Sequence, residues 1–176
     1  MKIILISGKA QAGKTTTAYL AKRAIEEKKK LAVVINYGDL LKHICRNYFD
    51  WDGQKDELGR RQLQWIGTNY VRSKNPNYWV DFVKNFARLF NDIWDYMIVG
   101  DCRFKNEIDW SDFEEKSIHV RICRPNYDNG LSELQKSHPS ETDLDDTSSD
   151  FCIINDGTIS DLDKNIRDII DFFEET

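Results

Sequence analysis

The segment Gly8–Thr15, with the sequence GKAQAGKT, lies directly after an apolar run and before a helix-forming sequence. Its spacing, G-x-x-x-x-G-K-[ST], allows backbone N–H groups to converge on an anion, an approach that side chains at Gly8 and Gly13 would block. The pattern is specific when a strand precedes it and a helix follows it, and both flanks have that character. The sequence therefore predicts a strand, a phosphate-binding loop and a helix at the start of the chain.

Short apolar runs rich in isoleucine and valine recur along the chain and alternate with helical patterns. The predicted strands are Ile3–Ser7, Leu31–Asn36, Tyr96–Gly100, Ile118–Cys123 and Phe151–Asn155. The predicted helices are Lys14–Lys29, Asp39–Phe49, Asp56–Val71, Pro76–Asn91 and Ser160–Phe173. Strands that alternate with helices form a parallel sheet covered on both faces. We therefore expect an α/β, three-layer fold with a five-stranded parallel sheet, and the length of 176 residues predicts one domain over residues 1–176.

The stretch Arg124–Asp150 has no clear periodicity and contains Pro125, Gly130 and Pro139. It is too long for a simple connection in a compact domain, and such loops are commonly lids or disordered segments. We expect residues 124–150 to form a lid-like insertion.

Composition limits the classes of partner. Charged residues make up 31% of the chain and the net charge is −5, so no global basic character points to nucleic acid. The apolar stretches are shorter than a membrane span and the N-terminus lacks a cleavable signal, which predicts a cytoplasmic location without membrane contact. The four cysteines show no C-x-x-C pair and are expected to be reduced, without zinc or a disulfide framework.

The residues expected to bind ATP are Gly8, Ala10, Ala12, Gly13, Lys14, Thr15 and Thr16. Backbone amides at a helix N-terminus hold the β-phosphate in such a loop, the lysine reaches the β and γ oxygens, and the hydroxyl of Thr15 ligates Mg²⁺. Asp101, at the end of YMIVGD, is the second expected magnesium ligand, and a cap of a turn or helix is the alternative for it. ATP is favoured over GTP because no N-K-x-D signature occurs.

Several basic residues lie where predicted strands end, namely Lys42, Arg103, Arg121 and Arg124. In a doubly wound sheet the carboxyl ends of the strands line the ligand crevice, so these cations are expected to surround a transferring phosphoryl group. On the third predicted helix, Arg61, Thr68 and Arg72 fall within about 20° of one line, opposite Leu63, Ile66 and Tyr70. Trp65, Tyr78 and Trp79 are candidates for stacking on a base, with core packing as the alternative.

The stretches GKAQAGKTT, YGDLLK, RRQLQWIGTNYVRSKNPNYWV, VGDCRFKNEID, SHPSETDLDD and FCIINDGTISDL occur in order over nearly the whole chain. In these the chain resembles bacteriophage-type deoxynucleoside monophosphate kinases, a branch of the P-loop nucleoside monophosphate kinase superfamily. The resemblance implies a five-stranded parallel sheet, a mobile lid and ATP-dependent phosphorylation of a deoxynucleoside monophosphate (dNMP). YGDLLK is also similar to the GDLLR segment of adenylate kinases, which by analogy assigns Lys42 to the acceptor phosphate.

The sequence departs from adenylate kinases in its lid, where Pro125–Asp150 contains no arginine. The arginine of the lid must then be Arg121 or Arg124, which together with Lys14 and Arg103 form the expected catalytic set. The expected acceptor-binding residues are Asp39, Lys42, Trp65, Arg72, Trp79 and Arg103. His138, Ser140 and Glu141 of SHPSE belong to the closing segment, without an assigned role.

Two alternatives remain open at this point. The stretch RRQLQW to VGDCRFKNEIDW is also similar to animal phosphomevalonate kinases, and a P-loop ATPase switch would use the same loop. For an alcohol acceptor Asp39 would be the natural base. The expected partners are ATP and a dNMP, and the oligomeric state is left open, with a homodimer as one option.

Overall fold

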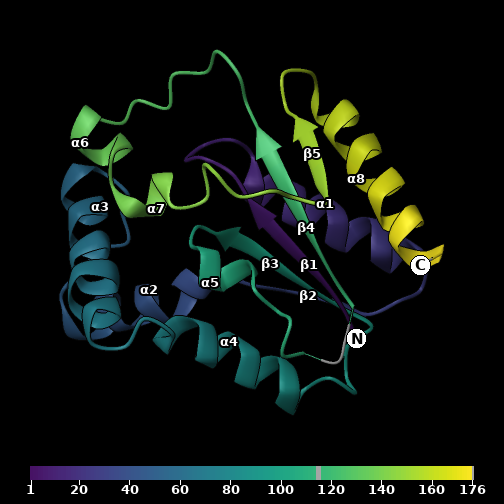
Figure 1. Ribbon diagram of the computed structural model, residues 1–176, viewed down its shortest axis with the longest axis horizontal. Coiled ribbons are helices and arrows are strands. Elements are labelled where there is room, and N and C mark those ends of the chain that lie inside the picture. Colours follow the sequence, from purple (N-terminus) through teal and green to yellow (C-terminus); the bar gives the residue numbers. More distant parts are fainter. Residues whose placement is uncertain (114–115, 176) are drawn as a thin grey trace.

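Strand β1 (Lys2–Ser7) is the centre of a five-stranded parallel sheet with the order β2-β3-β1-β4-β5 (Figure 1). The computed structural model describes residues 1–113 and 116–175. The other strands are β2 (Ala32–Ile35), β3 (Tyr96–Cys102), β4 (Ser117–Cys123) and β5 (Phe151–Ile154). Ile4 of β1 pairs with Ile98 of β3 on one side and with Ile118 of β4 on the other. The predicted α/β fold with five parallel strands is confirmed.

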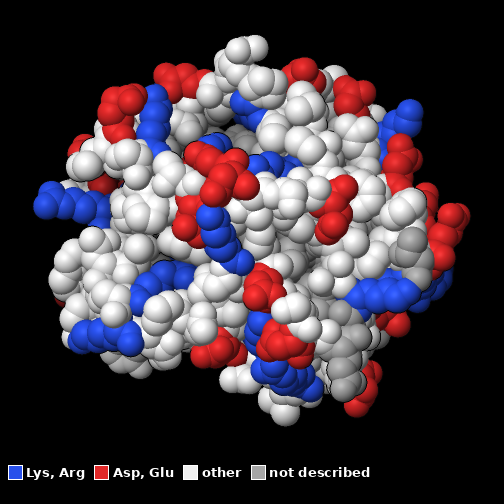
Figure 2. Space-filling view, viewed as in Figure 1, with Lys and Arg blue, Asp and Glu red and all other residues white. Residues whose placement is uncertain are grey.

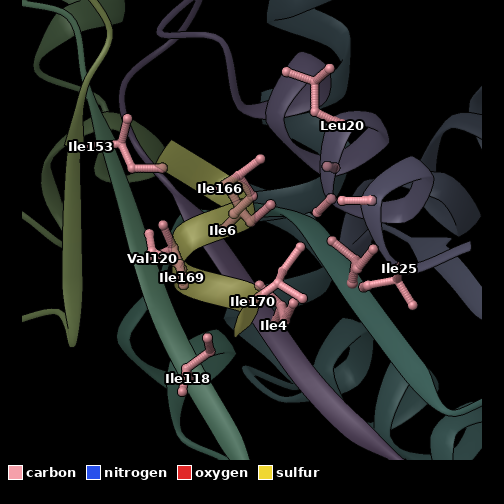
Figure 3. Close-up of a cluster of buried hydrophobic side chains, with 14 of the residues drawn as sticks. Ile4, Ile6, Leu20, Ile25, Ile118, Val120, Ile153, Ile166, Ile169 and Ile170 are labelled. Carbon is pink, nitrogen blue, oxygen red and sulfur yellow. The ribbon is translucent and has the colours of Figure 1, made fainter. Parts of the chain in front are cut away.

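Helices cover both faces of this sheet because alternate residues of β1 point to opposite faces. Ile4 and Ile6 share one buried cluster with residues of α1 (Lys14–Glu27) and α8 (Ile159–Glu175), and Figure 3 shows them beside Ile166 and Ile170 of α8. Ile3 and Leu5 share the other cluster with Trp79 and Val83 of α4 (Tyr78–Leu89), against which α2 (Tyr37–Tyr48) also packs. The three layers follow from this alternation.

The third predicted helix is two elements, α3 (Glu57–Gln64) and the π-helix η1 (Trp65–Arg72). A π-helix has i→i+5 hydrogen bonds and more residues per turn than an α-helix, so an α-helical projection across it drifts out of phase. Two predictions about its faces are therefore wrong. Arg60, rather than Arg61, lies on the same side as Thr68 and Arg72 and lines a cavity with them. Tyr70, which was predicted on the buried face, is 48% exposed.

Residues 124–150 connect β4 to β5 and pass over the carboxyl ends of the strands (Figure 1). They contain two short helices that the sequence pattern did not predict, α6 (Glu133–Lys136) and α7 (Pro139–Thr142). A further short helix, α5 (Lys105–Ile108), follows β3. Arg121 of β4 attaches the end of this segment to the sheet. Its Nη2 donates to the carbonyl oxygens of Leu144 at 2.6 Å and Thr147 at 2.7 Å. The mobility of this segment stays a prediction.

The neighbouring strands β4 and β5 bring two distant cysteines together. All four cysteines are free thiols, and the sulfur atoms of Cys123 and Cys152 lie 3.3 Å apart. Within residues 1–113 and 116–175, no helix has both the length and the apolar character needed to cross a membrane.

Candidate active site

A cavity of about 890 Å³ lies at the carboxyl edge of the sheet. Its volume is in the range of sites that enclose small molecules. Its walls come from the loop before α1, from α2, α3 and η1, from the end of β3, and from residues 124–141. Figure 2 shows acidic and basic side chains close together around a hollow in the upper part of this face. Segments that are far apart in the sequence therefore share one site.

The loop Gly8–Gly13 depends on its two terminal glycines. Both have positive φ angles, 140° at Gly8 and 109° at Gly13, which side chains rarely adopt. A Cβ at Gly8 would collide with the carbonyl oxygen of Ile122, and one at Gly13 would lie 2.5 Å from Nδ2 of Asn155. That Asn155 amide donates to the carbonyl oxygen of Ala12 at 2.8 Å. Neighbouring residues of the fold therefore require glycine at both positions.

The ammonium group of Lys14 lies inside this loop. Its Nζ donates to the carbonyl oxygens of Gly8 at 2.6 Å and Lys9 at 2.7 Å. Because an ammonium has three donors, one N–H remains for a ligand in the cavity. Burial, followed by the charge of Arg103, lowers the pKa of Lys14 to about 7.

The other predicted loop residues divide between the cavity and the core. Ala10, Gly13, Thr15 and Thr16 line the cavity together with Lys14, and both threonines are exposed. Ala12 is 3% exposed and packs with the core beneath the loop. Neither Ala12 nor Gly8 lines the cavity, so these two residues support the conformation of the loop and do not face a ligand.

Asp101 at the end of β3 caps the N-terminus of α2. Its Oδ1 accepts from the backbone N–H of Tyr37 at 2.8 Å, and its Oδ2 accepts from that of Gly38 at 3.1 Å. Asp101 therefore has a capping role on α2, and its predicted role as a magnesium ligand stays a prediction. Each carboxylate oxygen keeps a further acceptor position, and Asp101 lines the same cavity as Thr15.

The described residues contain no group of three or more histidines, cysteines and acids able to hold a metal ion. Magnesium does not require such a group, since it binds through one or two protein oxygens together with water and substrate phosphates. The hydroxyl of Thr15 and the carboxylate of Asp101, both at the cavity wall, suit that mode of binding.

The basic residues predicted for the acceptor already have carboxylate partners. Lys42 Nζ lies 2.8 Å from Asp39 Oδ1, while Asp39 Oδ2 accepts from the backbone N–H of Asn36 at 3.0 Å as a helix cap. Arg72 forms an ion pair with Glu107, and Arg103 forms one with Glu141. All three basic residues line the cavity, so the structure brings them together as predicted.

Glu107 anchors the most buried of these pairs. Its Oε2 accepts from the backbone N–H of Arg103 at 2.6 Å and of Phe104 at 3.1 Å, and the Arg72 guanidinium lies 4.0 Å above the Phe104 ring. Burial raises the pKa of Glu107 to about 7, although Arg72 acts in the opposite direction. The position of Arg72 is therefore fixed by a buried network.

Two basic residues that the sequence analysis missed, Lys55 and Arg60, also line the cavity. Among the described residues, neither forms an ion pair with a carboxylate. Lys55 is exposed overall, yet desolvation and then the charge of Lys42 lower its pKa. Arg60 and Gln64 of α3, followed by Thr68 and Arg72 of η1, line the cavity at four-residue intervals.

The three predicted aromatic candidates differ in position. Trp79 lines the cavity but is 3% exposed, and its Nε1 donates to the carbonyl oxygen of Gly67 at 3.0 Å. Trp65 lies outside the cavity, is 55% exposed, and stacks on Tyr70 at a centroid distance of 5.6 Å. Tyr78 also lies outside it and packs edge-on against Trp79. Of the three, only Trp79 can contact a ligand in this cavity.

The two arginines predicted for the lid, Arg121 and Arg124, differ in their position relative to the cavity. Arg124 lines the cavity beside the loop, with its guanidinium 3.7 Å from the centre of the Tyr127 ring. Arg121 does not line it, and its guanidinium is held by the carbonyls of Leu144 and Thr147.

The sequence profile described as Deoxynucleotide monophosphate kinase matches residues 54–166. The chain belongs to the deoxynucleotide monophosphate kinase family. The match contains Lys55, Arg60, Arg72 and Arg103 of the cavity, together with Glu107 and Glu141, the carboxylate partners of Arg72 and Arg103. The phosphate-binding loop lies before it.

A curated relative from Enterobacteria phage T4, named deoxynucleotide monophosphate kinase, is 28% identical over 113 residues. The aligned part is 63% of this chain and 44% of that kinase, so the alignment spans less than half of the relative's length.

Solved structures show the same fold. The APS kinase of Mycobacterium tuberculosis in complex with AMPPNP and APS is 17% identical, with a TM-score of 0.58 over 98% of this chain and 97% of that one. The dephospho-CoA kinase of Campylobacter jejuni is 12% identical, with a TM-score of 0.50 over 97% of each chain. At these identities the likeness establishes the fold of this deoxynucleotide monophosphate kinase family member and nothing further.

Proposed function

We propose that this protein transfers the γ-phosphoryl group of ATP to the phosphate of a dNMP, yielding the diphosphate and ADP. One observation carries the proposal. A single cavity is lined by a phosphate-binding loop and by five cationic side chains from later segments of the chain, Lys42, Lys55, Arg60, Arg72 and Arg103. An ATPase that used water as acceptor would have no second anion for these cations. Membership of the deoxynucleotide monophosphate kinase family supports the choice of acceptor.

On the donor side, the loop amides and the N-terminus of α1 would hold the β-phosphate, and the remaining N–H of Lys14 would reach the transferring group. Thr15 and Asp101 would hold Mg²⁺, which supplies charge neutralisation on the phosphates when bound. Arg124 would stabilise the equatorial oxygens of the transferring group. Arg121, bound to backbone carbonyls outside the cavity, is assigned the structural role of fixing residues 144–147.

On the acceptor side, Lys55 and Arg60 would bind the acceptor phosphate together with Lys42. Within the described part of the chain neither of them pairs with a carboxylate, whereas Lys42 pairs with Asp39 and Arg72 pairs with Glu107. A phosphate acceptor has a second pKa near 6 and is already ionised at neutral pH, so its oxygen attacks the γ-phosphorus without a general base. Asp39 is then a cap of α2 and a partner of Lys42 rather than a base.

The direct test measures ADP release with a panel of dNMPs, ribonucleoside monophosphates and phosphomevalonate. We expect turnover that depends on at least one dNMP. Turnover that depends on phosphomevalonate alone would favour that acceptor instead, and ADP release independent of any acceptor would favour an ATPase switch. Asp39→Asn adds a second criterion: it should keep about a tenth or more of wild-type turnover, whereas an alcohol acceptor predicts a loss of about 10²–10⁴.

A further inference from the structure

We propose that Glu141, in the segment SHPSE, is a positioning residue that holds the Arg103 side chain against the phosphate-binding loop during phosphoryl transfer. The inference rests on the proposed function and assigns a role to a motif that the sequence left without one. It also gives residues 124–150 a specific connection to the reacting groups.

The carboxylate of Glu141 bridges two parts of the site. One oxygen, Oε2, accepts from the backbone N–H of Ala10 in the loop at 2.8 Å. The other, Oε1, forms the ion pair with Arg103. The side chain is only 6% exposed, so both contacts are made in a desolvated setting where charge-assisted hydrogen bonds are strong.

The backbone around Glu141 strengthens the same bridge. The carbonyl oxygen of Ser140 accepts from Arg103 Nη1 at 3.2 Å, and the carbonyl oxygen of Glu141 accepts from Lys9 Nζ. The main chain of Arg103 is fixed separately by Glu107. Removing the charge of Glu141 is thus expected to free the Arg103 side chain while leaving its backbone in place.

The sequence SHPSE explains how Glu141 reaches this place. His138 is the N-cap of α7, and its Nδ1 accepts from the backbone N–H of Ser140 at 3.2 Å, while Pro139 takes the first helical position. Asp143 at the end of α7 accepts from the backbone N–H of Lys105 at 2.8 Å. The short helix is therefore held at both ends, with Glu141 facing the loop.

Electrostatics explain why Arg103 needs such a partner. The charge of Arg103 acts on Lys14 and favours its neutral form, while Glu141 acts in the opposite direction. Two cations near one another repel, and a long arginine side chain without a partner gains rotamer freedom by turning towards solvent. Glu141 offsets the repulsion and keeps both cations directed at the same phosphoryl group.

The test is a double-mutant cycle of Glu141→Gln and Arg103→Ala, assayed with the best dNMP of the panel. Glutamine keeps the shape and can still accept from Ala10, but it lacks the charge. We expect Glu141→Gln to lower kcat by about 10- to 100-fold with the KM for ATP changed by less than about twofold. The double variant should be no slower than Arg103→Ala alone, within about twofold, because Glu141 acts through Arg103. Losses that multiply, or an unchanged kcat in Glu141→Gln, would overturn the proposal.

Asp146→Asn is the matched control. Asp146 lies in the same segment, is exposed, and pairs with Lys105 away from the loop. Its loss should change kcat by less than about twofold, as expected for an exposed ion pair. A reduction in Asp146→Asn equal to that in Glu141→Gln would show that any disturbance of the segment slows turnover, and would refute a specific role for Glu141.

A readout without turnover separates this inference from the proposed function. In NMR spectra of the wild-type protein, the guanidinium N–H groups of Arg103 should be protected from rapid exchange. The protection should disappear in Glu141→Gln and remain in Asp146→Asn. If no acceptor supports turnover but this pattern is seen, the proposed function fails and the Glu141–Arg103 contact stands. An unprotected Arg103 in the wild type would refute the contact itself.

Discussion

The two walls of the cavity are built in different ways. The proposed donor wall is the contiguous segment from Gly8 to Thr16. It offers backbone amides, the ammonium group of Lys14 and the hydroxyl of Thr15, and its lysine is bound to carbonyls of the same loop. The proposed acceptor wall gathers Lys42, Lys55, Arg60 and Arg72, and two of these four cations, Lys42 and Arg72, are paired with carboxylates. The donor wall thus depends on local backbone geometry, whereas the acceptor wall depends on tertiary placement and on a balance of charges.

The largest effect that tests this comparison is expected on the donor wall. Lys14→Ala should lower kcat by about 10²–10³-fold with every acceptor, because it removes a preorganised charge at the transferring group. Steady-state kinetics with two different dNMPs would measure it. Lys22→Ala, at a partly exposed site on α1 that pairs with Glu26, is the control and should stay within about twofold. A loss that depends on the identity of the acceptor would mean that Lys14 serves both walls.

The next effect is expected on the acceptor wall. Lys55→Ala and Arg60→Ala should each raise the KM for the dNMP by about 10- to 50-fold, the value of a charge-assisted hydrogen bond, and leave the KM for ATP within about twofold. Arg61→Ala is a matched control, since Arg61 neighbours Arg60 but lies exposed outside the cavity. An equal rise in Arg61→Ala, or an equal rise in the KM for ATP, would contradict the assignment of this wall.

A smaller effect is expected from pH. The pKa of Lys14 is lowered to about 7, so its ammonium is charged below that pH and loses its proton above it. The affinity for a nonhydrolysable ATP analogue should therefore weaken as pH rises above 7, by up to about tenfold per pH unit. Calorimetric titration across pH 6 to about 9 would measure the slope. In Lys14→Arg the guanidinium stays protonated and the slope should flatten; an identical slope would assign the titration to another group.

The smallest effect is expected at Trp65. Trp65→Ala should leave the KM for every dNMP within about twofold, because its ring is exposed outside the cavity and stacks on Tyr70. Acceptor kinetics would check this, with thermal unfolding as a control for stability. A rise above about tenfold would indicate that η1 rearranges around the acceptor and that the acceptor wall is not assembled in advance.

Much of the donor wall was predictable from sequence because its determinants are local. A few neighbouring residues specify the strand, the loop and the helix. They are the glycines at the ends of the loop, a lysine, a threonine and the two flanking apolar patterns. The structure placed Lys14, Thr15 and Thr16 at the cavity, where they were predicted. The contact of Asp101 with the N-terminus of α2 could not be predicted, because it depends on the position of α2 beside β3.

The acceptor wall was predicted less completely, and the misses have physical causes. Arg60 and Lys55 carry no signal of their own among other polar residues, and an α-helical projection favoured Arg61 because a π-helix cannot be read from spacing. The aromatic character of Trp65 and Trp79 suggested a contact with a base for both. Trp79 is buried beside the cavity, whereas Trp65 is exposed outside it, and the sequence does not record this difference.

The sequence by itself determined the sheet and the phosphate-binding loop, because hydrophobic periodicity and glycine geometry act over a few residues. Only the tertiary structure decided which charges meet. The pairs Arg72–Glu107 and Arg103–Glu141 join residues that lie 35 and 38 positions apart in the chain. These pairs form because folding brings the two side chains together and buries their carboxylates, a condition that no local pattern records.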